Sequence, residues 1–305
     1  MISVEGISKS YSPKQPLAVD SLDLEVNDGE ILGLVGLNGA GKTTTIRMMS
    51  GVTLPSSGKI NVDGYDIVRD KVKASGKVGW IPEFPNFEPN AKPVPLMSYF
   101  AGFYGLRGKE EDSEIRKRLG AVGLSQDLNK KLRTYSQGMK KRYSMAESLI
   151  GDPQNVMFDE TLNGLDPEGV QFVRNMIMGL KKDGKAVLLS SHILSEVQNI
   201  ADRVAVIHHG KLIKLLKKDQ LKSLGVNTIH VGVDKVDDKF SSLLSEYGGV
   251  RMSGNTAIIS HLKVADKEYS EIPEKIIKSG YKLREFHSTG ESLEDYFFSL
   301  IGETQ

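Results

Sequence analysis

The stretch Gly36-Leu37-Asn38-Gly39-Ala40-Gly41-Lys42-Thr43 decides the fold of this 305-residue chain. An apolar segment that ends at Val35 precedes it, and we expect a helix to begin near Lys42 and to end at Gly51. A strand, a glycine-rich loop and a helix in this order are the context of a phosphate-binding loop. The alternative is a chance glycine-rich turn, which would not explain the Lys-Thr pair at the start of the helix.

The residues of this loop are expected to hold a nucleoside triphosphate. Glycines let the backbone N–H groups approach phosphate oxygens, and the helix N-terminus adds partial positive charge. We expect Lys42 to reach the β- and γ-phosphates, Thr43 to hold Mg²⁺ through its hydroxyl, and Thr44 to support the phosphates. The expected nucleotide-binding residues here are Gly36, Asn38, Gly39, Ala40, Gly41, Lys42, Thr43 and Thr44.

Two carboxylates follow a second apolar segment. Residues 155–158 are predicted as a buried parallel strand, and Asp159 and Glu160 stand at its C-terminal end. Open α/β sheets carry their sites at this edge. We expect Asp159 to organise Mg²⁺ and Glu160 to polarise the water that attacks the γ-phosphate. Ordinary solvated loop charges are the alternative, which the phosphate-binding loop upstream disfavours.

These motifs, in this order, resemble those of the ATP-binding cassette (ABC) ATPases. The segment Tyr135-Ser136-Gln137-Gly138-Met139 keeps the serine and the second glycine of the family signature Leu-Ser-Gly-Gly-Gln, and we expect a helix from Gly138 to about Ile150. This helix start is too far along the chain, and too differently oriented, to serve the nucleotide at Lys42. The resemblance implies a head-to-tail dimer, in which Ser136 and Gly138 close on ATP held by a second ABC ATPase subunit.

The resemblance assigns roles to four more residues. His192 follows an apolar strand predicted over residues 186–190, and it matches the family histidine that contacts the γ-phosphate. Asp166 matches the loop that crosses to the partner subunit. Glu83 stands where the family usually has glutamine and is expected to offer an oxygen to Mg²⁺. Tyr11 matches the position that stacks on adenine, with simple packing as its alternative.

Three features resemble the subset of cassettes that pair with ABC-2 type transmembrane permeases: the Tyr-Ser-x-Gly-Met signature, Glu83, and the ending Ser292-Leu293-Glu294-Asp295-Tyr296-Phe297. One departure from the family is Thr161-Leu162, where Pro-Thr is usual. The resemblance implies an ATPase subunit that powers transport, with export favoured, through a separate permease. The transported substrate, and the choice between a homodimer and a heterodimer, stay open.

Two rival interpretations come from other classes. A soluble ABC ATPase that acts on the ribosome or on nucleic acid would share the catalytic set, but such proteins carry two cassettes or long coiled coils. A P-loop kinase or switch GTPase would lack the signature and His192. The chain has one cassette and no heptad repeat, so both rivals are disfavoured.

Composition places limits on the partners and the location. The chain has 40 Lys plus Arg against 39 Asp plus Glu, so no overall field attracts nucleic acid, and none is expected as a partner. It has no cysteine, and we find no signal peptide and no apolar run of the roughly 18 residues that a membrane helix needs. We expect a soluble, cytoplasmic protein, held at the inner face of the cell membrane by its permease.

The segment after the predicted strand at residues 78–81 is rich in aromatic and proline residues. Its rings are Trp80, Phe84, Phe87, Tyr99, Phe100, Phe103 and Tyr104. They could present an apolar groove to a helix of the permease or form the core of a helical subdomain, and the sequence supports both equally. The basic stretch 211–218 is predicted as a strand after a hairpin turn, in preference to a membrane-surface helix.

The expected fold is α/β, with a P-loop NTPase core of the ABC type and a small α+β C-terminal domain. Residues 1–224 form the nucleotide-binding domain, with a helical signature subdomain at about 84–150, and residues 225–305 form the accessory domain. In the latter we predict strands at 228–233, 250–253, 256–260 and 282–286, and helices at 238–247 and 267–279. This βαββαβ order indicates a ferredoxin-like domain. A last helix is expected at 293–301, and the role of this domain stays open.

Overall fold

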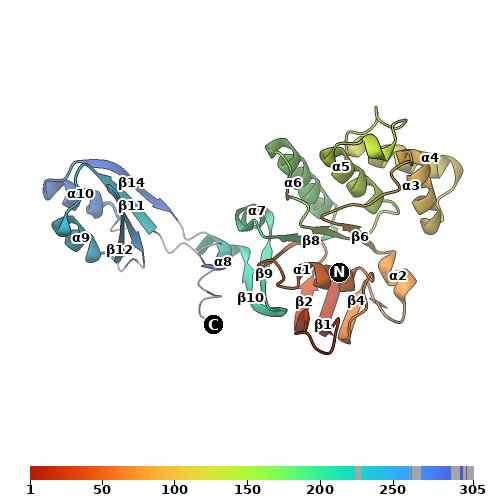
Figure 1. Cartoon of the computed structure of the whole chain (residues 1–305), viewed down its shortest axis with the longest axis horizontal. Helices are drawn as coiled ribbons and strands as arrows, with labels where there is room; N and C mark the ends of the chain where they lie inside the picture. The colour runs from red at the N-terminus through yellow and green to blue at the C-terminus, as the bar shows by residue number, and fades with distance from the viewer. Residues whose placement is uncertain (224–227, 261, 263–268, 290–295, 298–299, 301–305) are drawn as a thin grey trace. The chain divides into compact units, whose positions relative to one another are not determined.

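The computed structural model of the chain describes residues 1–223, 228–260, 262, 269–289, 296–297 and 300. The chain divides into two compact units, Met1–Lys218 and Asp219–Gln305 (Figure 1). The predicted boundary after residue 224 falls outside the described residues and stays a prediction.

A six-stranded sheet forms the centre of the first unit. Five neighbouring strands are parallel, and the sixth pairs antiparallel with its neighbour. The central strands are mostly apolar, and every residue in them is buried, as expected for parallel strands that are covered on both faces. In spatial order the strands are β10 (Lys211–Lys217), β9 (Arg203–His208), β3 (Ile31–Val35), β8 (Ala186–Ser191), β7 (Asn155–Asp159) and β6 (Val78–Ile81).

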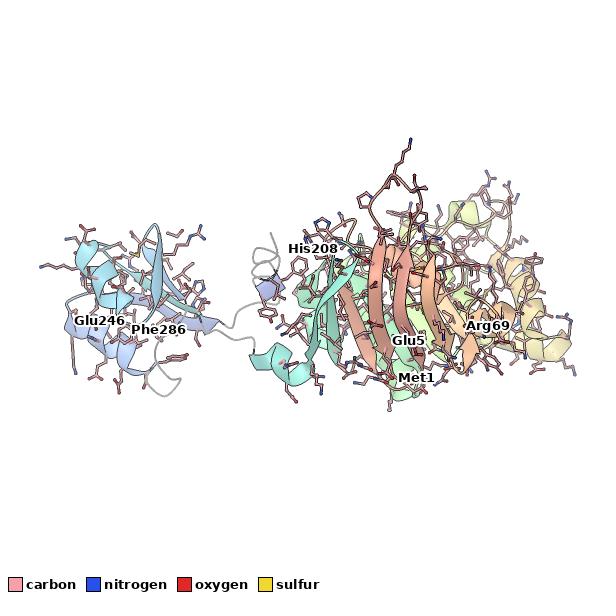
Figure 2. All side chains as sticks on the ribbon, turned by 90° about the horizontal axis from the view of Figure 1, so that it is seen from below. Met1, Glu5, Arg69, His208, Glu246 and Phe286 are labelled. Carbon is pink, nitrogen blue, oxygen red and sulfur yellow. The ribbon has the colours of Figure 1, made fainter. Side chains whose placement is uncertain are left out.

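A second, antiparallel sheet belongs to the same unit. Its strands in spatial order are β2 (Val19–Val26), β1 (Ile2–Lys9), β4 (Ser57–Val62) and β5 (Tyr65–Asp66). Figure 2 shows these strands side by side, with Glu5 of β1 labelled. Helix α1 (Lys42–Met49) shares one apolar core with both sheets through Ile46, Met48 and Met49. This packing fixes the helix that begins at Lys42 against the central sheet.

The remaining helices of the first unit pack against strands or against one another. Helices α3, α4 and α5 contact one another and gather at one end of this unit (Figure 1). They fall within the predicted helical subdomain, whose limits stay a prediction. The bounds are α2 (Lys71–Ser75), α3 (Pro93–Ala101), η1 (Gly102–Tyr104), α4 (Gly108–Ala121), η2 (Leu132–Thr134), α5 (Gln137–Ser148), α6 (Pro167–Lys182) and α7 (Leu194–Ile200).

The second unit has the predicted βαββαβ order. Its antiparallel sheet has the strand order β12-β13-β11-β14, which is the ferredoxin-like topology. The elements are β11 (Thr228–Val233), α9 (Asp238–Ser245), β12 (Gly249–Ser253), β13 (Thr256–Ser260), α10 (Glu271–Lys278) and β14 (Leu283–Thr289), with α8 (Lys218–Ser223) at the junction. Residues 267–268 of the predicted helix at 267–279, and most of the helix expected at 293–301, lie outside the described residues.

The predicted strand over the basic stretch is confirmed as β10, which pairs with β9 through the turn at His209-Gly210. In this strand Leu216 is buried, whereas Lys211, Lys214 and Lys217 are exposed, and the pairing with β9 shifts register between Leu212 and Lys214. Among the described residues, we find no helix whose length and hydropathy would let it cross a lipid bilayer.

Candidate active site

The glycine-rich loop joins β3 to α1, and two of its glycines are required by close backbone approaches. A Cβ on Gly41, whose φ is 106°, would lie 2.6 Å from the carbonyl oxygen of Ala18. A Cβ on Gly36 would lie 2.4 Å from the carbonyl oxygen of Ile207. Any side chain at these positions would displace backbone, so the loop can wrap around an anion only with glycine there.

The side chain of Lys42 lies inside this loop. Its Nζ donates hydrogen bonds to the carbonyl oxygens of Gly36 at 2.8 Å and Leu37 at 3.3 Å. It also forms an ion pair with Oε1 of Glu160 at 3.0 Å. Only 5% of Lys42 is exposed. The loop therefore holds one cation, with a direct electrostatic link to a carboxylate at the end of β7.

Asp159 is held at the end of β7 by two hydroxyl groups. Thr43 Oγ1 donates to Asp159 Oδ1 at 3.0 Å, and Ser190 Oγ of β8 donates to the same oxygen at 2.9 Å. Burial raises the pKa of Asp159, and these two hydrogen bonds oppose the rise. Ser190 lies in a predicted strand, but sequence analysis assigned it no role in the site.

Glu160 occupies a backbone conformation that is uncommon for a residue other than glycine, with φ of 49°. Its N–H donates to Ser190, at 3.0 Å from Oγ and 3.2 Å from the carbonyl oxygen. These contacts to the neighbouring strand hold the turn that directs its carboxylate toward Lys42.

The carboxylate of Glu160 is surrounded by donors. Oε2 receives hydrogen bonds from the backbone N–H of His192 at 3.2 Å and from Asn163 Nδ2 at 3.0 Å, and it lies 2.9 Å from His192 Nδ1. Burial alone would raise the pKa of Glu160, but Lys42, then His192 and Asn163, lower it below the usual value. The group is therefore ionised at neutral pH.

Asn163 is a site residue that sequence analysis missed. Besides its bond to Glu160, its Nδ2 donates to Glu83 Oε1 at 3.3 Å and lies 3.5 Å from His192 Nδ1. The backbone N–H of Asn163 donates to the carbonyl oxygen of Glu160 at 3.2 Å, which closes a tight turn. A polar residue three positions after a catalytic-type acid, in a turn, was the signal that could have identified it.

These side chains line one cavity of about 250 Å³ at the carboxyl edge of the parallel sheet. The structure brings together most of the predicted nucleotide residues there and adds Ala18 and Asn163. Gly36, Ala40 and Asp159 are not among the lining residues, although Gly36 and Asp159 accept hydrogen bonds from Lys42 and Thr43, which are. The lining residues are Ala18, Asn38, Gly39, Gly41, Lys42, Thr43, Thr44, Glu83, Glu160, Asn163 and His192.

Tyr11 does not line this cavity in the described structure. The residue is 57% exposed, and Lys9 Nζ lies 5.4 Å from the ring centroid. The predicted stacking on adenine therefore stays a prediction.

The predicted signature residues lie in a different cavity of about 260 Å³, which Ser136, Gly138 and Asp166 line. Ser136 caps α5 by accepting the N–H of Met139 at 3.2 Å, and Asp166 caps α6 by accepting the N–H of Gly169 at 2.8 Å. In the described part of the chain, no residue lines both this cavity and the cavity at Lys42. Within one chain the two sets of residues are therefore not brought together.

A lysine of α5 contacts the turn that follows Glu160, at residues 160–163. Lys141 Nζ donates to the carbonyl oxygen of Thr161 at 3.0 Å and to that of Asn163. Burial lowers the pKa of Lys141, while the charge of Glu83 opposes the shift. The helix that begins at Ser136 thus contacts the backbone of the turn that positions Glu160.

The aromatic residues that follow the strand at residues 78–81 are partly buried in the helical subdomain and partly exposed. Phe87 packs edge-to-face on the buried Tyr143, with 4.8 Å between ring centroids. By contrast, Phe84 is 81% exposed, Phe103 72% and Tyr99 64%. Some rings build the helical core, and others form an exposed apolar surface.

Comparisons with known proteins agree with this geometry. The family described as "ABC transporter" matches residues 19–163. The chain is 32% identical to the bacitracin transport ATP-binding protein BcrA of Bacillus licheniformis, over 99% of this chain and 97% of that protein. It is 30% identical to the Nod factor export ATP-binding protein I of Ralstonia nicotianae, over 99% and 94% of the two chains. A solved structure of an ATP-binding subunit of an ABC transporter superposes with a TM-score of 0.67, at 26% identity, over 73% of this chain and 92% of that chain.

Proposed function

The chain belongs to the ATP-hydrolysing, ATP-binding subunits of ABC transporters, and we propose that it drives export through a separate membrane permease. One observation carries the catalytic part of the proposal. Lys42 of the phosphate-binding loop, the ionised carboxylate of Glu160 and His192 meet in one cavity. A buried cation and a base at the same point suit the binding and hydrolysis of a terminal phosphate.

In the proposed reaction Glu160 acts as the general base. Lys42 exchanges its carboxylate partner for the γ-phosphate of ATP, which leaves Glu160 free to accept a proton from water. The water oxygen bonds to the γ-phosphorus, and the bond from this phosphorus to the bridging oxygen breaks. ADP leaves with that electron pair. His192 contacts the γ-phosphate, and the amide of Asn163 keeps the carboxylate of Glu160 in place.

Three residues at or beside the cavity at Lys42 fit a magnesium ion. Thr43 Oγ1 and Asp159 Oδ1 lie 3.0 Å apart, and Glu83 lines the cavity together with Thr43 and offers a further carboxylate. Hydroxyl and carboxylate oxygens suit this hard cation, which usually takes only one or two protein carboxylates beside substrate phosphates. We assign Thr43, Asp159 and Glu83 to Mg²⁺. Bound Mg²⁺ would neutralise charge on the β- and γ-phosphates.

We further propose that two such subunits pair head to tail around two ATP molecules. The separation of Ser136, Gly138 and Asp166 from the cavity at Lys42 supports this arrangement. The helix N-terminus that Ser136 caps supplies N–H groups suited to an anion. In the dimer, these residues would complete the site around the γ-phosphate held by the other subunit.

For the partner we propose a permease of the ABC-2 type, with the subunit at the inner face of the membrane. The signature Tyr135-Ser136-Gln137-Gly138-Met139 and Glu83 support this choice by their resemblance to that subset. The direction of transport follows the relatives, one of which is named for Nod factor export. The relatives matched over nearly the whole chain are named for transport, which weighs against an ATPase that acts on the ribosome or on nucleic acid.

Purification from the detergent-solubilised membranes of its own cells tests this proposal. A tagged chain should release phosphate from MgATP and co-purify with a multispanning protein that mass spectrometry identifies. Lys42→Ala is the control and should lose phosphate release while keeping the membrane partner. Recovery of ribosomal or DNA-bound proteins, with no multispanning protein, would overturn the proposed partner.

A further inference from the structure

The turn at residues 160–163 needs support from its surroundings, because it begins with a strained residue. Glu160 has a φ of 49°, a conformation that a residue other than glycine keeps only when neighbouring groups hold it. Ser190 accepts the backbone N–H of Glu160, at 3.0 Å from Oγ and 3.2 Å from its carbonyl oxygen. Within the turn, the N–H of Asn163 donates to the carbonyl oxygen of Glu160 at 3.2 Å. Neither contact restrains the carbonyl groups of Thr161 and Asn163.

Lys141 of α5 holds these two carbonyl groups. Its Nζ donates to the carbonyl oxygen of Thr161 at 3.0 Å and to that of Asn163. Within the described part of the chain, neither oxygen accepts another hydrogen bond. Thr161 has no exposed surface, so its carbonyl oxygen depends on a donor from the protein. Loss of the lysine donor would therefore leave carbonyl groups of the turn unpaired, which is costly for a buried group.

The side chain of Asn163 carries this restraint to the reacting carboxylate. Its Nδ2 donates to Glu160 Oε2 at 3.0 Å and to Glu83 Oε1 at 3.3 Å. The backbone carbonyl of the same residue is the one that Lys141 binds. A shift of the Asn163 backbone would therefore move its amide away from the carboxylate that accepts a proton in the proposed reaction.

Helix α5 itself does not depend on the ammonium group of Lys141. The residue lies in the interior of the helix, between Gln137 and Ser148, where the backbone hydrogen bonds are internal. Methionine has nearly the same helix propensity as lysine and also has an unbranched side chain. Replacement of Lys141 by methionine would thus keep the helix and remove the donor to the turn.

We propose that Lys141 is a positioning residue for ATP hydrolysis: it holds the turn at residues 160–163, so that Asn163 keeps the carboxylate of Glu160 aligned. The inference rests on the proposed function, because it assigns a residue to the reaction in which Glu160 is the base. Lys141 does not line the cavity at Lys42, so it acts through the turn and not on the nucleotide held there.

Lys141→Met tests this role in the full-length protein. Phosphate release from MgATP gives kcat and KM, and isothermal titration calorimetry gives the affinity for ATP. We expect kcat to fall by about tenfold, with an ATP affinity within about twofold of the wild type. Lys117→Met, the same change at an exposed position of α4, is the matched control and should keep the wild-type kcat.

A conservative variant separates the donor from the bulk of the side chain. Lys141→Arg should recover most of kcat, because a guanidinium group can donate to both carbonyl oxygens. Thermal melting checks that each variant folds. If Lys141→Met does not fold, Lys141→Gln takes its place, and this shorter, neutral side chain should give a lower kcat than Lys141→Arg.

A double-mutant cycle shows whether Lys141 acts through Asn163. If it does, Lys141→Met and Asn163→Ala together should lower kcat by clearly less than the product of the two single losses. A purely structural contribution of Lys141 would give independent losses. The inference would be overturned by a kcat of Lys141→Met equal to that of Lys117→Met, by a loss confined to ATP affinity, or by independent losses in the double variant.

The same assays separate this inference from the proposed function. If the wild type released no phosphate, or if Glu160→Gln kept its turnover, the proposed reaction would be wrong, and the positioning role would fall with it. An active wild type, an impaired Glu160→Gln and an unaffected Lys141→Met would overturn the role of Lys141 alone.

Discussion

The carboxylate of Glu160 has two roles that compete: it pairs with Lys42, and in our proposal it accepts a proton from water. Its ion pair with Lys42 is buried, with side-chain exposures of 7% and 6%, and it keeps the carboxylate ionised. A general base, however, must be free to take a proton from water. Replacement of Glu160 by γ-phosphate as the partner of Lys42 resolves this conflict. In our proposal the base becomes available only when ATP is bound.

Glu160→Gln tests this role at the scale of one residue. The amide keeps the size of the side chain but cannot accept the proton, so turnover should fall roughly 10²-fold or more while ATP still binds. Phosphate release and nucleotide binding measure the two effects, and size-exclusion chromatography with MgATP should show a trapped dimer. Glu110→Gln is the matched control. An unchanged turnover would remove Glu160 from the mechanism.

Asn163→Ala tests the residue that positions this base. The change removes the amide that donates to Glu160 and Glu83. Hydrogen bonds to charged groups contribute about 1.5–3 kcal/mol, so we expect kcat to fall by about tenfold or more with little change in ATP affinity. Asn175→Ala, at an exposed position of α6, is the control. Equal kcat in both variants would show that Asn163 does not orient the base.

At the scale of elements, α5 connects three separate features. Ser136 caps the start of α5 and lines the cavity that also contains Asp166. Lys141, in the middle of the helix, donates to the turn that follows Glu160. Glu147, near the end of the helix, lines a cavity between α2, β6, η1 and α5. A helix is rigid over this length, because its backbone hydrogen bonds are internal. A displacement of α5 would therefore also move its contact with the turn that carries Glu160 and Asn163.

The buried acid of α5 predicts a pH-dependent stability. The pKa of Glu147 is raised in the folded chain from 4.5 to about 7, so the folded state binds the proton more tightly than the unfolded state. The stability from this group is complete below pH 4.5 and is lost as the pH rises through 7. We expect Glu147→Gln to match the wild type at pH 5 and to be more stable by about 2–3 kcal/mol at pH 8.

Urea unfolding of the two proteins at pH 5 and pH 8 measures this difference. The other ionisable side chains that face Glu147 are Tyr143 on α5, Lys71 on α2 and Tyr104 on η1. They are present in both proteins, so their titration cancels in the comparison. An equal stability difference at both pH values would show that the carboxyl is not perturbed.

At the level of the whole molecule, the two sets of residues that the proposed dimer would join lie at different places in the described chain. The phosphate-binding loop and Glu160 line one cavity, and Ser136 and Asp166 line the other. A two-fold pairing of identical subunits would create two complete sites from these two sets.

Mixing two inactive variants tests this pairing. Lys42→Ala removes the cation of the loop. Ser136→Asp keeps a side chain that can cap α5 but places a negative charge beside the γ-phosphate. Each variant alone should hydrolyse little ATP, whereas a mixed dimer has one intact site. We expect the mixture to regain roughly a quarter of the wild-type rate, since half of randomly paired dimers are mixed and each has one complete site.

The control for this experiment is a mixture of wild type with Lys42→Ala, which fixes the activity of a dimer with one intact loop. Occlusion of two ATP molecules per Glu160→Gln dimer provides an independent count of the sites. If the mixture stays inactive and the dimer occludes no nucleotide, the head-to-tail arrangement is wrong for this chain.

The fold class and most of the residues that line the cavity at Lys42 could be predicted without a structure, because both depend on short-range rules. Glycines in the loop, the helix start at Lys42 and acids at the end of an apolar strand are local signals, as are the alternating residues of the ferredoxin-like unit. The predicted strand at 228–233 matches β11, for the same reason.

Which distant groups meet could be learned only from the folded chain. The hydrogen bonds of Ser190 to Asp159 and of Asn163 to Glu83, and the unpaired carboxyl of Glu147 between α2, β6, η1 and α5, join segments far apart in the chain. Periodicity and motif spacing report which face of an element is buried, but not which neighbour packs against that face. Partners and burial shift pKa values, so the electrostatic state of Glu160 and Glu147 could emerge only once the chain had folded.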